Sequence, residues 1–132
     1  MAFKNREQQI AAAVYAWAAM HRDELVRDAM DLIRIPSHAE YGPVIERMMA
    51  LGEKYGFSCE RDEDYSVDLL WPGAGAGHEL GMLGHLDVVP EGEGWRYQPY
   101  EPIEKSGYII GRGSSDNKGP VATALYVMRC MK

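Results

Sequence analysis

A histidine and an aspartate stand two residues apart in the apolar run from Leu80 to Val89. Because side chains alternate along an extended segment, His85 and Asp87 are predicted to point to the same face. We expect the run to form a buried parallel strand that carries this pair at its carboxyl end, where open α/β sheets place their ligand sites. A buried charge needs a partner, so the pair indicates either a metal ligand with its orienting carboxylate or a core histidine satisfied locally. Spacing alone leaves both interpretations open.

A second segment, Gly111 to Pro120, joins a predicted strand to a predicted helix and contains Asp116. Its glycines and serines permit tight turns and a close approach of the backbone to a ligand. Asp116 is expected at the edge of the sheet, either as a ligand or as a helix N-cap, for which Asp is a preferred residue. The residue order that a phosphate-binding P-loop requires is absent from the segment.

Taken together, the two segments supply the donor types of a metal site. His85 offers a neutral nitrogen, Asp87 a carboxylate that holds the imidazole, and Asp116 a carboxylate able to bridge two cations. Histidine and aspartate suit zinc and similar borderline metals, and a carboxylate between two ions is typical of two-metal hydrolytic sites. The combination therefore predicts metal-assisted hydrolysis.

The elements expected to position these residues alternate between helix and strand, an order typical of an α/β sheet covered by helices. The first helical pattern leaves open whether it forms one helix or two. Apolar spacing and turn residues predict helices over residues 4–34, 43–55 and 119–132, strands over 57–61, 67–71, 80–89 and 108–111, and a proline-rich loop over 90–105.

Composition limits the function classes. The chain has 132 residues, 14 Lys and Arg against 20 Asp and Glu, and a net charge of -6, so no nucleic-acid partner is expected. The longest apolar stretch, Ile10 to Met20, is shorter than the roughly 20 residues that span a bilayer, so no membrane contact is expected. A secretory signal is disfavoured by Glu7 and by the helical pattern that continues beyond it. The widely separated Cys59 and Cys130 favour a reducing, cytoplasmic location.

Three motifs carry a resemblance to a known family: Gly84 to Pro90, Gly94-Trp95 followed by Pro99-Tyr100, and Gly111 to Pro120. They resemble the metal-binding signatures of the co-catalytic zinc peptidase family, which includes aminoacylase, succinyl-diaminopimelate desuccinylase, carnosinase and the Xaa-His dipeptidases. The stretch from Leu51 to Phe57 is most similar to the bacterial dipeptidase branch.

The resemblance implies a role for each candidate residue. His85 would be a ligand of one metal, Asp87 the catalytic carboxylate that orients it, and Asp116 the bridge between two Zn²⁺ ions, with Mn²⁺ or Co²⁺ as alternatives. It also implies a cis peptide bond at Asp116–Asn117. Family members often have Asp at the position of Asn117 and Phe at that of Tyr100, and neither difference removes a ligand.

The resemblance implies that the catalytic machinery continues beyond this chain. The family's adjacent glutamates, its later ligands and its substrate-binding lid domain would all follow Lys132. The expected fold class is α/β, a three-layer helix-sheet-helix arrangement forming the N-terminal portion of a zinc-exopeptidase (phosphorylase/hydrolase-like) catalytic domain. Within it we expect helical residues 1–56, strand-rich residues 57–116 that hold the metal-site motifs, and a helix over 117–132.

The expected activity of the complete protein is metal-dependent hydrolysis of the amide bond of dipeptides. The chain itself is expected to be an incomplete and inactive fragment. The alternatives are a deacylase or desuccinylase of N-acyl amino acids and, from another class, a non-catalytic binding or partner domain. Because a sheet without its later strands leaves an open edge and an uncovered apolar face, we expect the fragment to self-associate.

Overall fold

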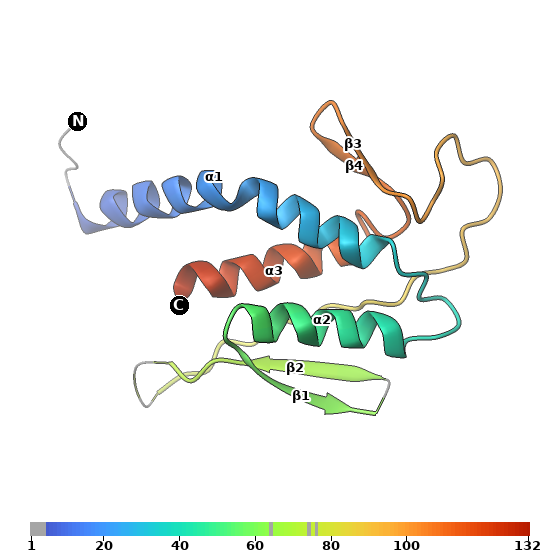
Figure 1. Ribbon diagram of the computed structural model, residues 1–132. Helices are drawn as coiled ribbons and strands as arrows, with labels where there is room; N and C mark the ends of the chain where they lie inside the picture. Colours follow the sequence, from blue (N-terminus) through green and yellow to red (C-terminus); the bar gives the residue numbers. More distant parts are fainter. Residues whose placement is uncertain (1–4, 64, 74, 76) are drawn as a thin grey trace.

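The computed structural model describes residues 5–63, 65–73, 75 and 77–132, so Lys4, where the first predicted helix begins, lies outside the described residues. The described residues form a mixed α/β structure of helices and two short antiparallel hairpins (Figure 1). In chain order the elements are α1 (Arg6–Ile33), α2 (Gly42–Lys54), β1 (Ser58–Asp62), β2 (Ser66–Leu70), β3 (Ile103–Lys105), β4 (Tyr108–Ile110) and α3 (Lys118–Met131).

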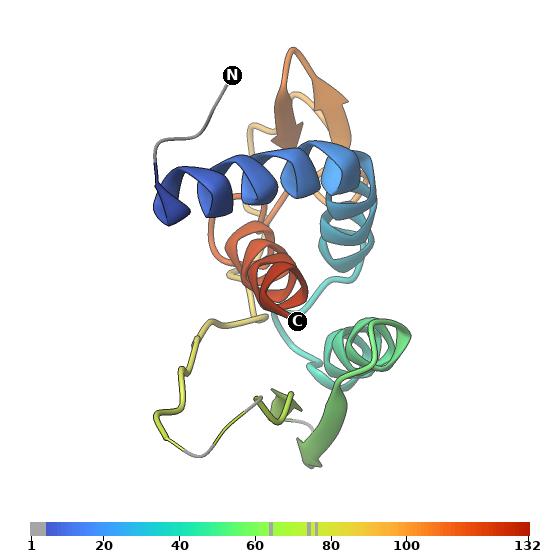
Figure 2. The same cartoon turned by 90° about the vertical axis from the view of Figure 1, so that its left-hand side faces the viewer.

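The first predicted helix forms as one continuous helix, α1, of 28 residues. Asn5 caps it, because its side-chain oxygen accepts a hydrogen bond from the Gln8 amide at 3.0 Å. The axis of α1 changes direction partway along (Figure 1, Figure 2). Its buried residues all lie in the C-terminal third, among them Leu32 and Ile33. This end of α1 therefore packs in the core and delivers the connection to α2.

The second predicted helix and the hairpin after it also form as expected. Pro43 lies in the first turn of α2, and Gly56, with a φ of 77°, follows its end. Strands β1 and β2 pair antiparallel, with Cys59 opposite Leu69. A Cβ atom on Gly52 would lie 2.7 Å from the Cys59 sulfur and 2.8 Å from Leu69, so the hairpin packs closely against α2 at this glycine.

The core forms where the three helices and the β1–β2 hairpin meet. In both views α3 lies between α1 and the pair formed by α2 and the hairpin (Figure 1, Figure 2). Each fully buried aliphatic side chain contributes about 1.5–3 kcal/mol by leaving water. The buried cluster consists of Ala29, Leu32, Val44, Met48, Leu51, Phe57, Ala122, Leu125 and Tyr126.

The apolar run over residues 80–89 does not form the predicted buried strand. Leu80 is 73% exposed and Leu83 103% exposed, and no strand pairs with the run in the part of the chain that the structure describes. A strand requires a neighbour for its backbone groups, whereas here the Val88 amide donates to the Ser37 carbonyl at 3.0 Å, in a connection between helices. The described strands make two separate two-stranded sheets, and the three-layer arrangement stays a prediction.

A short strand lies within the predicted loop over residues 90–105. Ile103–Lys105 forms β3 and pairs antiparallel with β4, the strand predicted over 108–111. The two residues that join them, Ser106 and Gly107, have φ angles of 53° and 82°, which a tight hairpin turn requires. This hairpin projects on the side of the helices away from β1 and β2 (Figure 1, Figure 2).

Candidate metal centre

The imidazole of His85 lies between the carboxylates of Asp87 and Asp116. Its Nδ1 is 3.1 Å from Oδ1 of Asp87, and its Nε2 is 2.9 Å from Oδ1 of Asp116. A neutral imidazole has one N–H, and an ionised carboxylate only accepts hydrogen bonds. Both contacts are therefore favourable together only when the ring is protonated or when a cation replaces one proton. The structure brings together all three residues that the sequence marks as site residues.

The two carboxylates favour the charged form of the ring. Partial desolvation lowers the pKa of His85, but hydrogen bonds with the backbone carbonyl of Asp87 and the side chain of Asp116, together with the charges of both carboxylates, outweigh it. The pKa of His85 consequently lies above its ordinary value. This ring environment attracts positive charge.

The site is open to solvent, contrary to the expectation of a buried pair. The side chains are 49% exposed for His85, 61% for Asp87 and 83% for Asp116. The physical reason is that residues 80–89 have no neighbouring strand in the described chain, so no sheet covers this edge. The core-histidine interpretation is therefore wrong for His85.

The loop before α3 directs Asp116 toward His85. Gly113 has a φ of 91°, and its carbonyl accepts a hydrogen bond from the Gly119 amide at 3.2 Å. A Cβ atom on Gly119 would lie 2.0 Å from the Ser114 carbonyl oxygen, so only glycine fits there. The Asp116–Asn117 peptide bond is cis, as the resemblance implies.

Asp116 is not the N-cap of α3. The cap residue is Asn117, whose side chain makes no capping hydrogen bond. The Oδ1 atom of Asn117 instead accepts a hydrogen bond from the His85 amide at 3.4 Å. Gly84 permits this approach, because a Cβ atom there would lie 2.9 Å from the same oxygen and 2.6 Å from Val121. The start of α3 and the His85 segment are thus packed directly together.

Two buried residues near the site were missed by the sequence reasoning. Ser37 and Lys118 are both 0% exposed. Burial lowers the pKa of Lys118 to about 8, and the charge of Asp87 opposes that shift. The sequence did contain an indication for Lys118. A lysine in the first turn of a helix interacts unfavourably with the helix dipole, so its presence there points to a specific contact.

The loop that follows Asp87 contains the aromatic residues of the second motif. The indole nitrogen of Trp95 donates to the Glu91 carbonyl at 2.6 Å, and the Arg112 guanidinium lies 5.1 Å from the Trp95 ring centre. The Tyr100 hydroxyl donates to a Glu91 carboxylate oxygen at 3.2 Å and lies 3.2 Å from Nδ1 of His38. A phenylalanine at this position would lack both contacts.

The donor set fits part of a zinc site. Zinc binds imidazole nitrogen and carboxylate oxygen at roughly 2.0–2.2 Å, so two donors 2.9 Å apart, His85 Nε2 and Asp116 Oδ1, are able to share one ion. The contact from Nδ1 to Asp87 is the usual arrangement for a histidine ligand and its orienting carboxylate. Within the described residues, however, no group of three or more His, Cys, Asp or Glu side chains is arranged to hold a metal.

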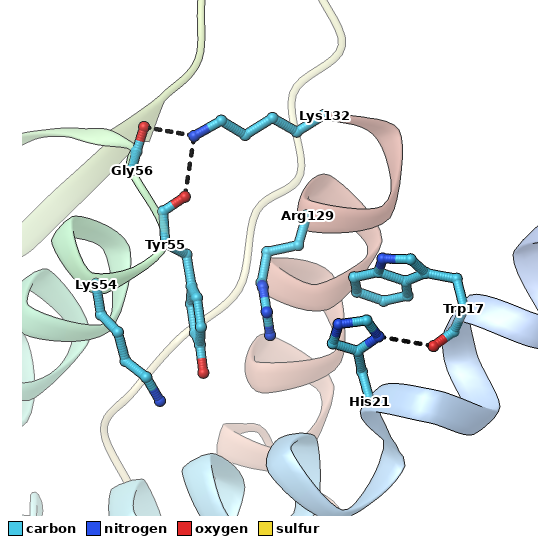
Figure 3. A pocket seen from close by; sticks show the side chains of 7 residues that line it. All are labelled: Trp17, His21, Lys54, Tyr55, Gly56, Arg129 and Lys132. Carbon is cyan, nitrogen blue, oxygen red and sulfur yellow. Dashed lines mark hydrogen bonds between the residues drawn. The ribbon is translucent and has the colours of Figure 1, made fainter.

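A separate cleft lies at the other end of α3, and none of the candidate metal residues lines it (Figure 3). Arg129 stacks on the ring of Tyr55 at 3.5 Å from its centre and binds Glu24 at 3.0 Å. Lys132 donates to the carbonyls of Tyr55 and Gly56 at 3.0 and 2.7 Å. These contacts tie α1, α2 and α3 together. The cleft is lined by Trp17, His21, Lys54, Tyr55, Gly56, Arg129 and Lys132.

No helix in the described part of the chain is both long and apolar enough to cross a membrane.

Comparison with known proteins identifies relatives of the chain. Residues 81–132 match Peptidase family M20/M25/M40. Over 130 residues the chain is 37% identical to the Beta-Ala-Xaa dipeptidase of Lactobacillus delbrueckii subsp. lactis, covering 87% of this chain and 27% of that protein. It is 31% identical over 125 residues to the putative dipeptidase YtjP of Bacillus subtilis, with 84% and 26% covered. A putative dipeptidase of Staphylococcus epidermidis is 32% identical over 124 residues, with the same coverage.

The chain thus spans about a quarter of the length of these curated relatives. The matched residues 81–132 contain His85, Asp87 and Asp116 together with the loop and helix that position them. The resemblance predicted from the motifs is confirmed: residues 81–132 match Peptidase family M20/M25/M40, and the chain is similar to the N-terminal part of proteins named dipeptidases.

Proposed function

We propose that this protein takes part in metal-dependent hydrolysis of the peptide bond of dipeptides. The observation that carries the proposal is the convergence of His85 Nε2 and Asp116 Oδ1, 2.9 Å apart, with Asp87 on the other ring nitrogen. Relatives that are named dipeptidases support peptide bonds as the substrate class. They favour dipeptides over the N-acyl amino acids of a deacylase or desuccinylase.

Each residue has a distinct task in this proposal. Asp87 accepts a hydrogen bond from the Nδ1–H group of His85, which leaves the Nε2 lone pair directed toward Asp116. His85 and Asp116 would hold Zn²⁺, with Asp116 shared between two ions. When bound, such a metal pair supplies Lewis acidity for the substrate carbonyl and lowers the pKa of a bound water. Asp116 is 83% exposed, so substrate has access to this side of the site.

The proposal places the complete activity in a longer protein. Two ligands fall short of the three protein ligands that a catalytic zinc site usually has, and the chain spans about a quarter of its relatives. We expect these 132 residues alone to be inactive and to form the N-terminal part of a three-layer catalytic domain. Further ligands and the general base would then come from residues outside this chain.

The test compares the product of the whole gene with the 132-residue chain, using β-alanyl and α-aminoacyl dipeptides as substrates. We expect the longer protein to release amino acids, to lose activity on chelation and to regain it with Zn²⁺. His85→Ala and Asp116→Ala should abolish that activity. Hydrolysis that survives chelation and both substitutions would refute the proposal, and preference for N-succinyl or N-acetyl amino acids would favour a deacylase.

A further inference from the structure

The connection between α1 and α2 contacts both halves of the candidate metal centre, namely the segment that carries His85 and Asp87 and the segment that carries Asp116. The connection spans residues 34–41, and within it residues 35–37 make the contacts; Ser37 binds the segment that carries His85 and Asp87. Two buried side chains, Ser37 and Lys118, make the contacts, and neither is a candidate ligand. Because their hydrogen bonds attach both halves to the same connection, they fix the position of one half relative to the other.

Ser37 holds the backbone on both sides of Asp87. Its hydroxyl donates to the Leu86 carbonyl at 2.6 Å, and its own carbonyl accepts from the Val88 amide at 3.0 Å. These two bonds orient the peptide groups that flank Asp87. Since this run has no strand partner in the described chain, Ser37 supplies contacts that a neighbouring strand would otherwise make.

Lys118 holds the other half to the same connection. Its ammonium group donates to the Ile35 carbonyl at 2.5 Å, and it stands two residues after Asp116. The loop before Asp116 lies against its stem, because a Cβ atom on Gly113 would be 3.1 Å from Cδ of Lys118 and 3.0 Å from Cγ1 of Val88. The packing therefore runs from Val88 through Gly113 to Lys118 without a gap.

If Ser37 and Lys118 only filled space in the core, they would not need polar groups. Methionine would occupy the volume of a lysine stem without the free-energy cost of desolvating an ammonium group. Lys118 nevertheless keeps its ammonium group at 0% exposure, where it donates to the carbonyl of Ile35. A buried polar group that reaches a second segment is suited to fixing the distance between the two.

We infer that Ser37 and Lys118 are positioning residues that set the separation of His85 Nε2 and Asp116 Oδ1 by anchoring both segments to residues 35–37. The inference rests on the proposed function only in so far as that pair binds zinc. The positioning itself is a property of the metal-free protein, so it is measurable without activity.

The test uses protein labelled with ¹⁵N-histidine, first metal-free and then titrated with Zn²⁺ against a chromophoric chelator. Ser37→Ala and Lys118→Met should shift the ring nitrogen resonances of His85 and weaken zinc binding about 10- to 100-fold, the effect usual for residues that support a ligand. The matched control is Tyr126→Phe, which removes a buried hydroxyl that donates to Asp28 at 2.7 Å on the same helix as Lys118. It should leave His85 resonances unchanged and zinc affinity within about twofold of the parent, below the range usual for a supporting residue.

The outcomes separate the two proposals. If the parent protein binds no zinc but Ser37→Ala and Lys118→Met still move the His85 resonances, positioning holds and the proposed function fails. If both variants resemble Tyr126→Phe in the His85 spectrum and in zinc affinity, positioning is overturned. If either variant does not fold, Ser37→Thr and Lys118→Arg are used instead, because they keep the hydrogen-bond donors. Folded variants with parental His85 resonances support positioning. Altered His85 resonances in these variants refute it.

Discussion

Nε2 of His85 lies 2.9 Å from Oδ1 of Asp116, although 31 residues separate them in the chain. The contact joins an extended segment to the loop that begins α3, and neither segment has the geometry by itself. A nitrogen and a carboxylate oxygen at this separation compete for one proton or share one cation. The carboxylate on the opposite ring nitrogen, from Asp87, favours the cation.

Asp87→Asn should weaken zinc binding while leaving the fold intact. The amide has nearly the shape of the carboxylate, but it lacks the negative charge that attracts the Nδ1 proton of His85. In the parent protein, Oδ1 of Asp87 lies 3.1 Å from that nitrogen. We expect zinc affinity to fall about 10- to 100-fold, measured by competition with a chelator. Asp68→Asn, on the exposed side of β2, removes the same charge elsewhere and should have no such effect. Equal losses in the two variants would indicate a general effect of charge.

Gly119→Ala should destabilise the chain although it lies in a helix. Alanine normally stabilises a helix interior by about 1 kcal/mol relative to glycine. Here the added Cβ would meet the Ser114 carbonyl at 2.0 Å, so the loop that carries Asp116 must move. We expect a loss of about 1–3 kcal/mol in the free energy of unfolding, measured with urea. Gly81→Ala, whose Cβ meets nothing within 4 Å, is the control. A stabilised Gly119→Ala would contradict the close contact.

Glu24 should make stability depend on pH below its ordinary pKa of 4.5. Desolvation raises the pKa of Glu24, but hydrogen bonds with Arg129 and Tyr55 and the charges of Arg129 and Lys54 hold it below that value. A carboxyl whose pKa is depressed by folding stabilises the chain above the unfolded pKa and loses that contribution as the pH falls through the folded pKa. Urea titrations from about pH 6 to about pH 3 should therefore show that the free energies of unfolding of Glu24→Gln and of the parent approach each other as the pH falls.

The ion pair between Glu24 and Arg129 is tested by repeating Glu24→Gln in a protein that lacks the Arg129 guanidinium. Glu24 and Arg129 are 3.0 Å apart, with side chains 28% and 14% exposed. In an Arg129→Gln background we expect Glu24→Gln to produce a smaller pH-dependent change in stability, because the guanidinium that donates to the Glu24 carboxylate is gone. An unchanged effect of Glu24→Gln would assign the pH dependence to Lys54, whose Nζ lies 3.6 Å from Glu24.

The 132-residue chain should self-associate through residues 80–89. Leu80 and Leu83 are 73% and 103% exposed on a run that has no strand partner in the described chain, and such apolar edges pair readily with other chains. We expect light scattering to show an average mass that rises with concentration. Serine at both positions should lower that mass. Serine in place of Tyr15 and Met20, which are 78% and 77% exposed on α1, should not. A monomer at high concentration would refute the prediction.

The helices and the first hairpin were predictable because their signals are local. Apolar spacing, Pro43 and Gly56 place α2 within one residue of its observed bounds, and the strands over 57–61 and 67–71 shift by one residue. β3 was missed because the prolines around it suggested a loop, whereas the Ser106-Gly107 turn was the relevant signal. The run over 80–89 was misassigned because strand formation depends on a neighbour, which hydrophobicity does not reveal.

The identity of the candidate residues was in the sequence from the start. A histidine two residues from an aspartate, and a second aspartate in a glycine-rich loop before a helix, define the donor types and carry the family resemblance. The meeting of these donors depends on contacts between distant segments: Ser37 with the backbone beside Asp87, Lys118 with Ile35, and Asn117 with the His85 amide. Local patterns specify which groups are available, but only long-range packing sets the distances and the solvent exposure on which their chemistry depends.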